Sequence, residues 1–113
     1  MKLIAKEIVG EHAISMQSGQ ILYSNLQESF GKDKKVQIDF EGVKFFASPF
    51  FNASIGYLLK DMDVAQLKDR VEIINLSDVG RSLLNLVIAN AINFYKNKGE
   101  SNLSIITKNA DEI

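Results

Sequence analysis

The sequence predicts a single α/β domain in which a mostly parallel central sheet of about four strands packs with three main helices. The main observation is that strand-like and helix-like segments alternate along the chain. Such alternation implies parallel strands joined by right-handed crossovers, with the helices covering the sheet. Size and composition agree, because 113 residues with 46% hydrophobic and 24% charged residues suit one globular core. We assign the domain to residues 1–100, and a C-terminal edge strand or frayed tail to residues 101–113.

The first third of the chain predicts strands and then a helix. Residues 3–9 mix β-branched and apolar side chains and predict the first strand, and residues 13–16 predict a short second one. A helix follows, with Ser15 or Ser18 as its N-cap and Gly31 at its end. Its apolar stripe has helical spacing and consists of Ile21, Leu22, Leu26 and Phe30.

The middle third predicts another strand and the clearest helix start in the chain. Residues 36–40 alternate between apolar and polar side chains, which is typical of a strand, and residues 43–47 predict a connection packed on the core. Ser48 then predicts an N-cap, and Pro49 fits the next position because its φ is already helical. The apolar stripe of this helix consists of Phe51, Ile55, Leu58 and Met62, widened by Phe50, Ala53 and Leu59.

The last third predicts a strand, a long helix and a final edge strand. Residues 71–76 predict the strand, and Ser77 or Asp78 caps a helix that runs to about Asn97. Residues 103–107 predict the edge strand. The buried face of the long helix consists of Leu83, Leu84, Val87, Ile88, Ala91 and Tyr95.

The charge balance and the residue inventory argue against several functions. Thirteen basic side chains against fourteen acidic ones give a net charge of −1, so no general field attracts a nucleic acid. The absence of cysteine excludes a thiol nucleophile and a thiolate metal site, and His12 is the only histidine. We therefore expect no metal, no cofactor, no nucleic-acid partner and no enzymatic activity.

The distribution of apolar residues argues against a membrane or secreted protein. No segment approaches the roughly 20 apolar residues that span a bilayer. Lys6 and Glu7 interrupt the apolar start, so it does not read as a signal peptide. We expect a cytoplasmic protein without a membrane partner.

A family resemblance lies in residues 36–59, which read Val-Gln-Ile-Asp-Phe-Glu-Gly-Val-Lys-Phe-Phe-Ala-Ser-Pro-Phe-Phe-Asn-Ala-Ser-Ile-Gly-Tyr-Leu-Leu. The Ile-Asp-Phe strand, the Gly-Val step and the Ser opening a Phe-rich helix that contains Gly56 resemble the STAS superfamily, the fold of the bacterial anti-anti-sigma factors. The segment looks in particular like the small STAS-like domains of unknown function found in bacteria and their phages. Ser15 and Gly19, which lead a helix after the first strand, fit that branch. The resemblance covers roughly residues 1–97.

The resemblance implies a regulatory role and draws attention to Ser48. In anti-anti-sigma factors a Ser at this position follows an Asp and is phosphorylated by an ATP-binding anti-sigma kinase. Here Ser48 follows Ala47 and precedes Pro49. The resemblance therefore implies a histidine-kinase-like ATPase as partner and Ser48 as a candidate phosphorylation site. It also implies that Asp39, with Gly42, supports the loop that carries Ser48.

Ser48, Asp39 and the phenylalanines near them can also be explained by roles in the fold alone, without a regulatory function. As an N-cap alone, Ser48 would contribute about 1 kcal/mol; a phosphate there would add nearly two negative charges and act on a bound partner. Asp39 is alternatively a solvent-side or strand-end carboxylate. Most of the four nearby phenylalanines should be core residues, and one or two at the surface would form a contact patch. The four are Phe45, Phe46, Phe50 and Phe51.

We predict a non-enzymatic regulatory module that binds another protein. The predicted contacts are the four phenylalanines and Ser48, with the loop of residues 15–19 as a further contact. The alternative is a STAS-like domain that senses a small ligand or a nucleotide, which a concave pocket beside Gly42 and Ser48 would favour.

Overall fold

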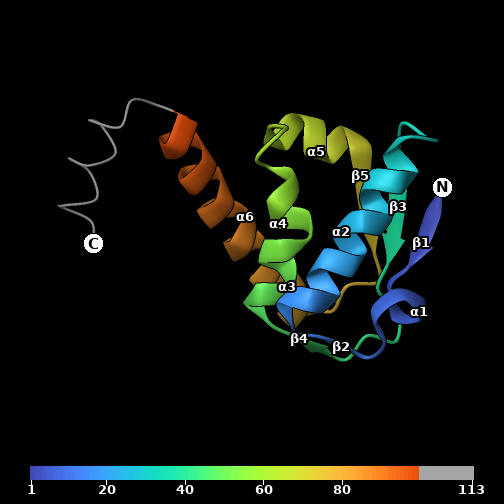
Figure 1. Ribbon diagram of the computed structural model, residues 1–113. Helices are drawn as coiled ribbons and strands as arrows, with labels where there is room; N and C mark the ends of the chain where they lie inside the picture. The colour runs from blue at the N-terminus through green and yellow to red at the C-terminus, as the bar shows by residue number, and fades with distance from the viewer. Residues whose placement is uncertain (100–113) are drawn as a thin grey trace.

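A computed structural model describes the main chain of residues 1–99 and the side chains of residues 1–96. Strands and helices alternate as predicted, and the α/β class is confirmed (Figure 1). The elements are β1 (Lys2–Ile4), α1 (Ala5–Val9), β2 (His12–Ala13), α2 (Met16–Phe30), β3 (Val36–Asp39), β4 (Phe45–Phe46), α3 (Ser48–Ala53), α4 (Ile55–Leu58), α5 (Val64–Arg70), β5 (Val71–Ile74) and α6 (Asp78–Gly99). The edge strand predicted at residues 103–107, and the tail assigned to residues 101–113, lie outside the described residues.

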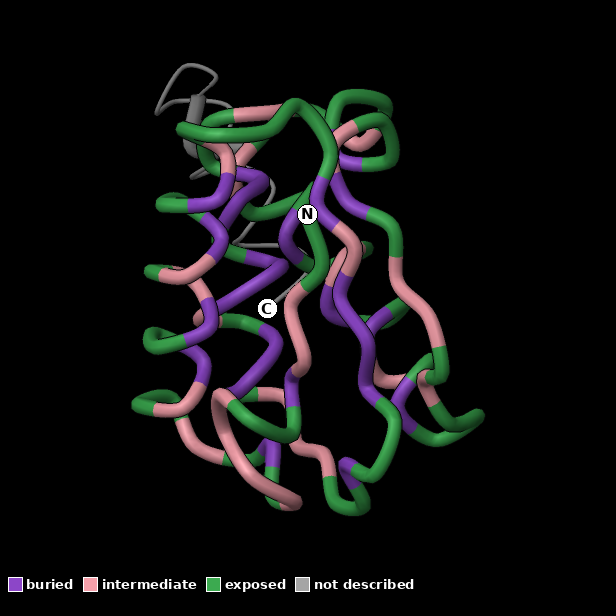
Figure 2. Tube along the Cα trace, turned by 90° about the vertical axis from the view of Figure 1, so that its right-hand side faces the viewer, coloured by how far each residue is buried: buried purple, intermediate pink, exposed green. Residues whose placement is uncertain are grey.

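The main sheet has three parallel strands in the order β1-β3-β5. Because the spatial order follows the chain order, right-handed crossovers place the connecting helices on one face. Figure 1 shows α2, α4 and α6 on that side, and Figure 2 shows the opposite face with no helix in front of the strands. With β2 and β4 forming a separate parallel pair, the main sheet has one strand fewer than predicted within residues 1–99.

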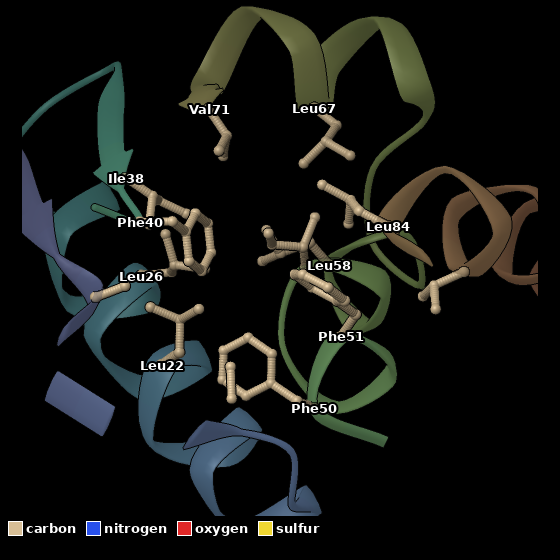
Figure 3. Close-up of a cluster of buried hydrophobic side chains, with 14 of the residues drawn as sticks. Leu22, Leu26, Ile38, Phe40, Phe50, Phe51, Leu58, Leu67, Val71 and Leu84 are labelled. Atoms are coloured by element: carbon tan, nitrogen blue, oxygen red, sulfur yellow. The ribbon is translucent and has the colours of Figure 1, made fainter. Parts of the chain in front are cut away.

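The one-sided cover explains the alternation of residues 36–40. Val36 and Ile38 are fully buried on the helical face, whereas Gln37 lies on the open face and donates a hydrogen bond from its Nε2 to Glu72 Oε1 (3.1 Å). The core between sheet and helices draws side chains from every layer (Figure 3). The labelled members are Leu22, Leu26, Ile38, Phe40, Phe50, Phe51, Leu58, Leu67, Val71 and Leu84.

The predicted first strand is too long. Only Lys2–Ile4 is extended, and residues 5–9 form α1. Ala5, Lys6 and Glu7 are strong helix formers, and they outweigh the β-branched residues that follow. The N–H of Gly10 donates to Lys6 O (2.8 Å) and completes the last turn of α1. Gly10 itself has a φ of 80°, which glycine adopts easily, and the helix ends there.

The helix predicted from Ser48 to Met62 is divided. It breaks at Ser54, whose φ of −115° and ψ of −96° separate α3 from α4. The Ser54 Oγ donates to Phe50 O (2.8 Å), a local bond that competes with the regular helical pattern. A further helix, α5, was not predicted. Its signal is Asp63 followed three residues later by Gln66, which form a reciprocal capping box.

The two remaining long helices follow the prediction closely. Ser15 Oγ accepts the N–H of Ser18 (3.0 Å) at the start of α2, and Ser77 Oγ accepts the N–H of Gly80 (3.1 Å) at the start of α6. Ile21 is the exception on the predicted α2 stripe, because it is half exposed. A search of the described helices finds none with the length and apolarity that a membrane crossing requires.

Candidate functional site

Ser48 is the first residue of α3, directly after β4. The predicted N-cap role is wrong, because Ala47 occupies the cap position with extended backbone and no side chain caps this helix. The reason is that Pro49 fits the second helical position as well as the first, so the helix begins one residue early. The Ser48 side chain is half-exposed and takes part in none of the hydrogen bonds found among residues 1–96.

Two serines therefore differ in their expected contribution to stability. Replacing Ser15 with alanine removes a cap from the 15-residue α2 and should lower the free energy of unfolding by about 1 kcal/mol. Replacing Ser48 with alanine should change it by less than about 0.5 kcal/mol, because no capping bond is lost. Urea denaturation of the two variants measures both values, and a larger loss for Ser48→Ala would contradict the cap assignment.

The β2–β4 pair brings the starts of α2 and α3 together. His12 pairs with Phe45, Ala13 pairs with Phe46, and the N–H of Ala47 donates to Ala13 O (3.0 Å). Figure 1 shows this pair beneath the first turns of both helices. The loop before α2 and the loop before α3 thus form one continuous surface.

Large apolar side chains are exposed on this surface. Ile14 is 40% exposed, Met16 56% and Phe45 52%. We call Ile14, Met16, Phe45, Ser48 and Pro49 the docking surface. Protein contact surfaces commonly present such apolar side chains within a polar surround.

A groove of about 470 Å³ extends the docking surface between α2 and α3. It is lined by Met16, Gln20, Pro49, Asn52, Ala53 and Tyr57. Neither Gly42 nor Ser48 lines it, so it does not lie where the small-ligand alternative expects a pocket.

Only one of the four predicted phenylalanines is freely accessible. Phe50 and Phe51 are fully buried, so their prediction as partner contacts is wrong. Phe46 is half-buried and stacks on Phe51 with ring centroids 5.7 Å apart. Phe45 is the exposed member, and its ring stacks on His12 at 4.9 Å. The expectation that one or two of the four reach the surface is confirmed.

Asp39 lies at the carboxyl end of β3 and links three segments. One oxygen, Oδ1, accepts the N–H of Glu41 (2.9 Å) and the Nδ2 of Asn75 (3.0 Å), and Oδ2 lies 3.4 Å from Lys2 Nζ. The carboxylate is buried and partnered at the end of β3, so the strand-end interpretation is correct and the solvent-side one is wrong. Its bond to Asn75, which has a φ of 58°, fixes the turn after β5.

The resemblance implies that Asp39, with Gly42, supports the loop that carries Ser48, and the contacts of Asp39 reach only the start of that loop. Asp39 holds Glu41, the residue before Gly42, and Gly42 has a φ of 85° with Lys6 packed beneath it. The described contacts of Asp39 stop there and do not extend to Ser48 itself. The two supporting residues therefore shape the turn that leads toward β4.

The environment of Asp39 sets a pH dependence of stability. The hydrogen bond from Asn75, the bond from the Glu41 N–H and the proximity of Lys2 lower the pKa of the Asp39 carboxyl, although its burial acts in the opposite direction. The unfolded-state pKa is about 3.9. Because the folded-state pKa is lower, the stabilisation is complete above the unfolded-state value and is lost as the pH falls through the folded-state value.

We therefore expect Asp39→Asn to destabilise the protein at neutral pH and to lose this effect in acid. The free energy of unfolding of both proteins, measured by urea denaturation between about pH 3 and pH 7, should show a constant gap above about pH 5 that narrows below about pH 4. A gap that widens toward low pH would contradict this assignment.

The described side chains hold no group of three or more His, Asp or Glu residues that could bind a metal ion. Met16 lies within residues 15–19, the predicted further contact, whereas the exposure of the apolar residues Ile14 and Tyr57 was not predicted. Periodicity cannot separate an exposed apolar residue at a helix start from a buried one, because only tertiary packing decides which is covered.

Comparison with protein families identifies the chain. A family model described as a STAS-like domain of unknown function (DUF4325) matches residues 18–81, from the first turn of α2 to the first turn of α6. No curated protein and no solved structure gives a significant match. The matched segment is more than half of the 113 residues and contains most of α2, together with β3, Ser48 and β5. The predicted resemblance is confirmed, and the chain belongs to the family of STAS-like domains of unknown function.

Proposed function

We propose that this protein is a non-enzymatic regulatory module that binds another protein through the docking surface. The observation that carries the proposal is the exposure of Ile14, Met16 and Phe45 around the first turn of α3. The β2–β4 pair holds them together although Ile14 and Phe45 are 31 positions apart in the sequence. Burial of each such side chain by a partner is worth about 1.5–3 kcal/mol.

The proposed partner is an ATPase of the histidine-kinase-like fold. The support is the likeness of Ser48 to the phosphorylated Ser of anti-anti-sigma factors, which bind ATPases of that kind. Ser48 sits among the exposed apolar residues, half-exposed and without a capping bond that a phosphate would have to break. A phosphate would place nearly two negative charges in the middle of the docking surface and would oppose an apolar contact there.

Alanine variants of the docking surface provide the test. Once a partner ATPase has been captured from the host and purified, Met16→Ala and Phe45→Ala should each weaken its affinity at least tenfold, equivalent to about 1.4 kcal/mol. Leu86→Ala is the matched control, because Leu86 is 55% exposed but lies two turns into α6, beyond the first turn that packs near Phe46. Isothermal titration calorimetry measures the affinities, and equal binding by all four proteins would refute this surface.

Ser48→Asp and Ser48→Ala test the regulatory part separately. If Ser48 is a switch, the Asp variant should bind the partner at least tenfold more weakly, while the Ala variant binds as wild type. Wild-type affinity of the Asp variant, together with no phosphate on Ser48 in cells by mass spectrometry, would leave a constitutive binding module. Tight binding of a nucleotide or metabolite, weakened by Asn52→Ala, would instead support a sensor.

A further inference from the structure

The long helix α6 carries a second apolar stripe on its outer side. Its inner face packs on α3 and α4, and the buried residues of that face are Leu84, Val87 and Ala91. On the outer side Val79 is 71% exposed, Leu86 55% and Phe94 58%. Figure 1 shows α6 at the edge of the helical layer, where no other described helix lies beyond it. This outer stripe is therefore uncovered within the described part of the chain.

The outer stripe has the spacing of a seam between two helices. Val79, Leu83, Leu86 and Asn90 follow one another at intervals of four, three and four residues, which keeps them on one side of the helix. A shallow groove of about 420 Å³ lies along the first half of the stripe. Its lining consists of Asp78, Val79, Ser82, Leu83 and Leu86. The stripe thus offers both apolar side chains and a concave surface to another helix.

The stripe also lacks the charged side chains that an exposed helix face normally carries. Arg81 is the only charged residue between Val79 and Tyr95, and it lines the groove beside β5 together with Ile73. Charged residues are depleted at the centres of protein interfaces, because burying an unpaired charge is costly. The composition of this face is therefore that of a surface covered by protein.

The charges at the two ends of the stripe favour a second copy of the same helix. Asp78 begins α6, and Lys96 lies eighteen residues later, which is five turns and so the same side of the helix. An antiparallel copy would bring Asp78 of each helix toward Lys96 of the other and would oppose the helix dipoles favourably. A parallel copy would instead bring like charges together at both ends.

We propose that α6 pairs with α6 of a second copy in an antiparallel, two-fold symmetric dimer. A two-fold axis places the same surface on both partners, so that each contact occurs twice. Leu86 lies midway between Val79 and Phe94, seven residues after the first and eight before the second. With the axis beside Leu86, the two Leu86 side chains meet, and Val79 of each copy lies beside Phe94 of the other.

The length of the contact sets its strength. From Val79 to Phe94 the stripe extends about 23 Å along α6. A strip of this length is at the small end of the range for specific interfaces, so the dimer should dissociate in the micromolar range. The stripe and the docking surface share no residue, so the two proposals can fail separately.

Sedimentation equilibrium of the full chain tests the dimer. With concentration rising to about 1 mM, the mass should increase from 12.6 kDa toward twice that value. Leu86→Lys places two like charges at the two-fold axis and should weaken the dimer at least tenfold. Ile21→Lys is the matched control, because Ile21 is 50% exposed but lies on α2. A full chain that stays monomeric, or equal affinities for Leu86→Lys and Ile21→Lys, would overturn the proposal.

Charge reversals at the ends of α6 test the antiparallel direction. Asp78→Lys and Lys96→Asp should each weaken the dimer at least threefold at low salt, because each places like charges opposite one another. The double variant restores opposite charges and should dimerise as wild type. In a parallel dimer neither reversal would change the sign of any facing pair. Unchanged affinity of both single variants would therefore overturn the antiparallel arrangement.

Engineered cysteines give a test that does not weaken the contact. The chain has no cysteine, so each variant carries one thiol. Under mild oxidation Leu86→Cys should form a disulfide between two copies, because its thiols meet at the axis. Val79→Cys is the control, since it is more exposed than Leu86 but should cross-link only when mixed with Phe94→Cys. Cross-linking of Val79→Cys alone as fast as Leu86→Cys would indicate random collision or a parallel pair and would overturn the proposal.

Discussion

Replacing Phe51 with alanine is expected to lower the free energy of unfolding by about 3–5 kcal/mol. Phe51 is fully buried and is in ring contact with three other phenylalanines. It stacks on Phe46 at 5.7 Å and meets Phe50 edge-on at 5.2 Å and Phe40 at 6.2 Å. Alanine would leave a cavity between the sheet and α3 that rigid neighbours cannot fill. A loss of this size is a large share of the roughly 5–15 kcal/mol that stabilises a typical domain.

Phe45→Ala is the matched control for Phe51→Ala. Phe45 is half exposed and contacts the ring of His12, so its removal should cost less than about 1 kcal/mol. Urea denaturation of the three proteins measures the difference directly. Equal losses for the two variants would contradict the separation of this segment into one exposed and several buried phenylalanines.

Gly19→Ala is expected to destabilise the protein although it replaces a glycine inside a helix. Alanine normally favours a helix over glycine by about 1 kcal/mol. At Gly19, however, an added Cβ would lie 2.4 Å from Phe50 O and 2.8 Å from Ala53 Cβ, because α2 crosses α3 closely there. The main chain of α3 cannot yield without moving the core residues Phe50 and Phe51. We expect a net loss of about 1–3 kcal/mol.

Gly31→Ala serves as the control for the close crossing. Gly31 ends α2 with a φ of −72°, and an added Cβ would lie 3.3 Å from Glu28 O. Alanine adopts this backbone conformation without strain, so the change in stability should stay within about 1 kcal/mol. Thermal unfolding of both variants checks the pair, and a Gly19→Ala protein as stable as wild type would mean that the two helices are not in close contact.

The elements that could be predicted are those whose signals are local. Residues 36–40 alternate between apolar and polar side chains because helices cover only one face of the sheet. The serines at positions 15 and 77 cap their helices through short-range hydrogen bonds. Residues 5–9 and Ser54 were predicted wrongly because hydrophobic periodicity does not weigh competing local preferences. Ala5, Lys6 and Glu7 favour a helix over the β-branched residues that follow, and the Ser54 hydroxyl bonds to Phe50 O at a place that periodicity alone treats as continuous helix.

The candidate site was predicted in location but not in composition. The segment around Ser48 does lie on the surface, yet Phe50 and Phe51 face the core and Met16 takes their place. Met16 lies within residues 15–19, the predicted further contact, but Ile14 was not predicted, and the β2–β4 pair, a two-residue contact between distant segments, brings this part of the chain beside Phe45. Such a short pairing has no distinctive sequence pattern, so the exposure of Ile14 and Met16 beside Phe45 could not be identified from the chain alone.

The order β1-β3-β5 has a consequence for how the chain assembles during synthesis. Because each strand pairs with the one completed before it, no existing strand pair has to open to admit a later strand. The emerging chain can extend its sheet in one direction, with each helix settling on the same side as it is made. Within residues 1–99, the strand order therefore gives no topological origin for misfolded states in which a late strand is trapped outside its pair.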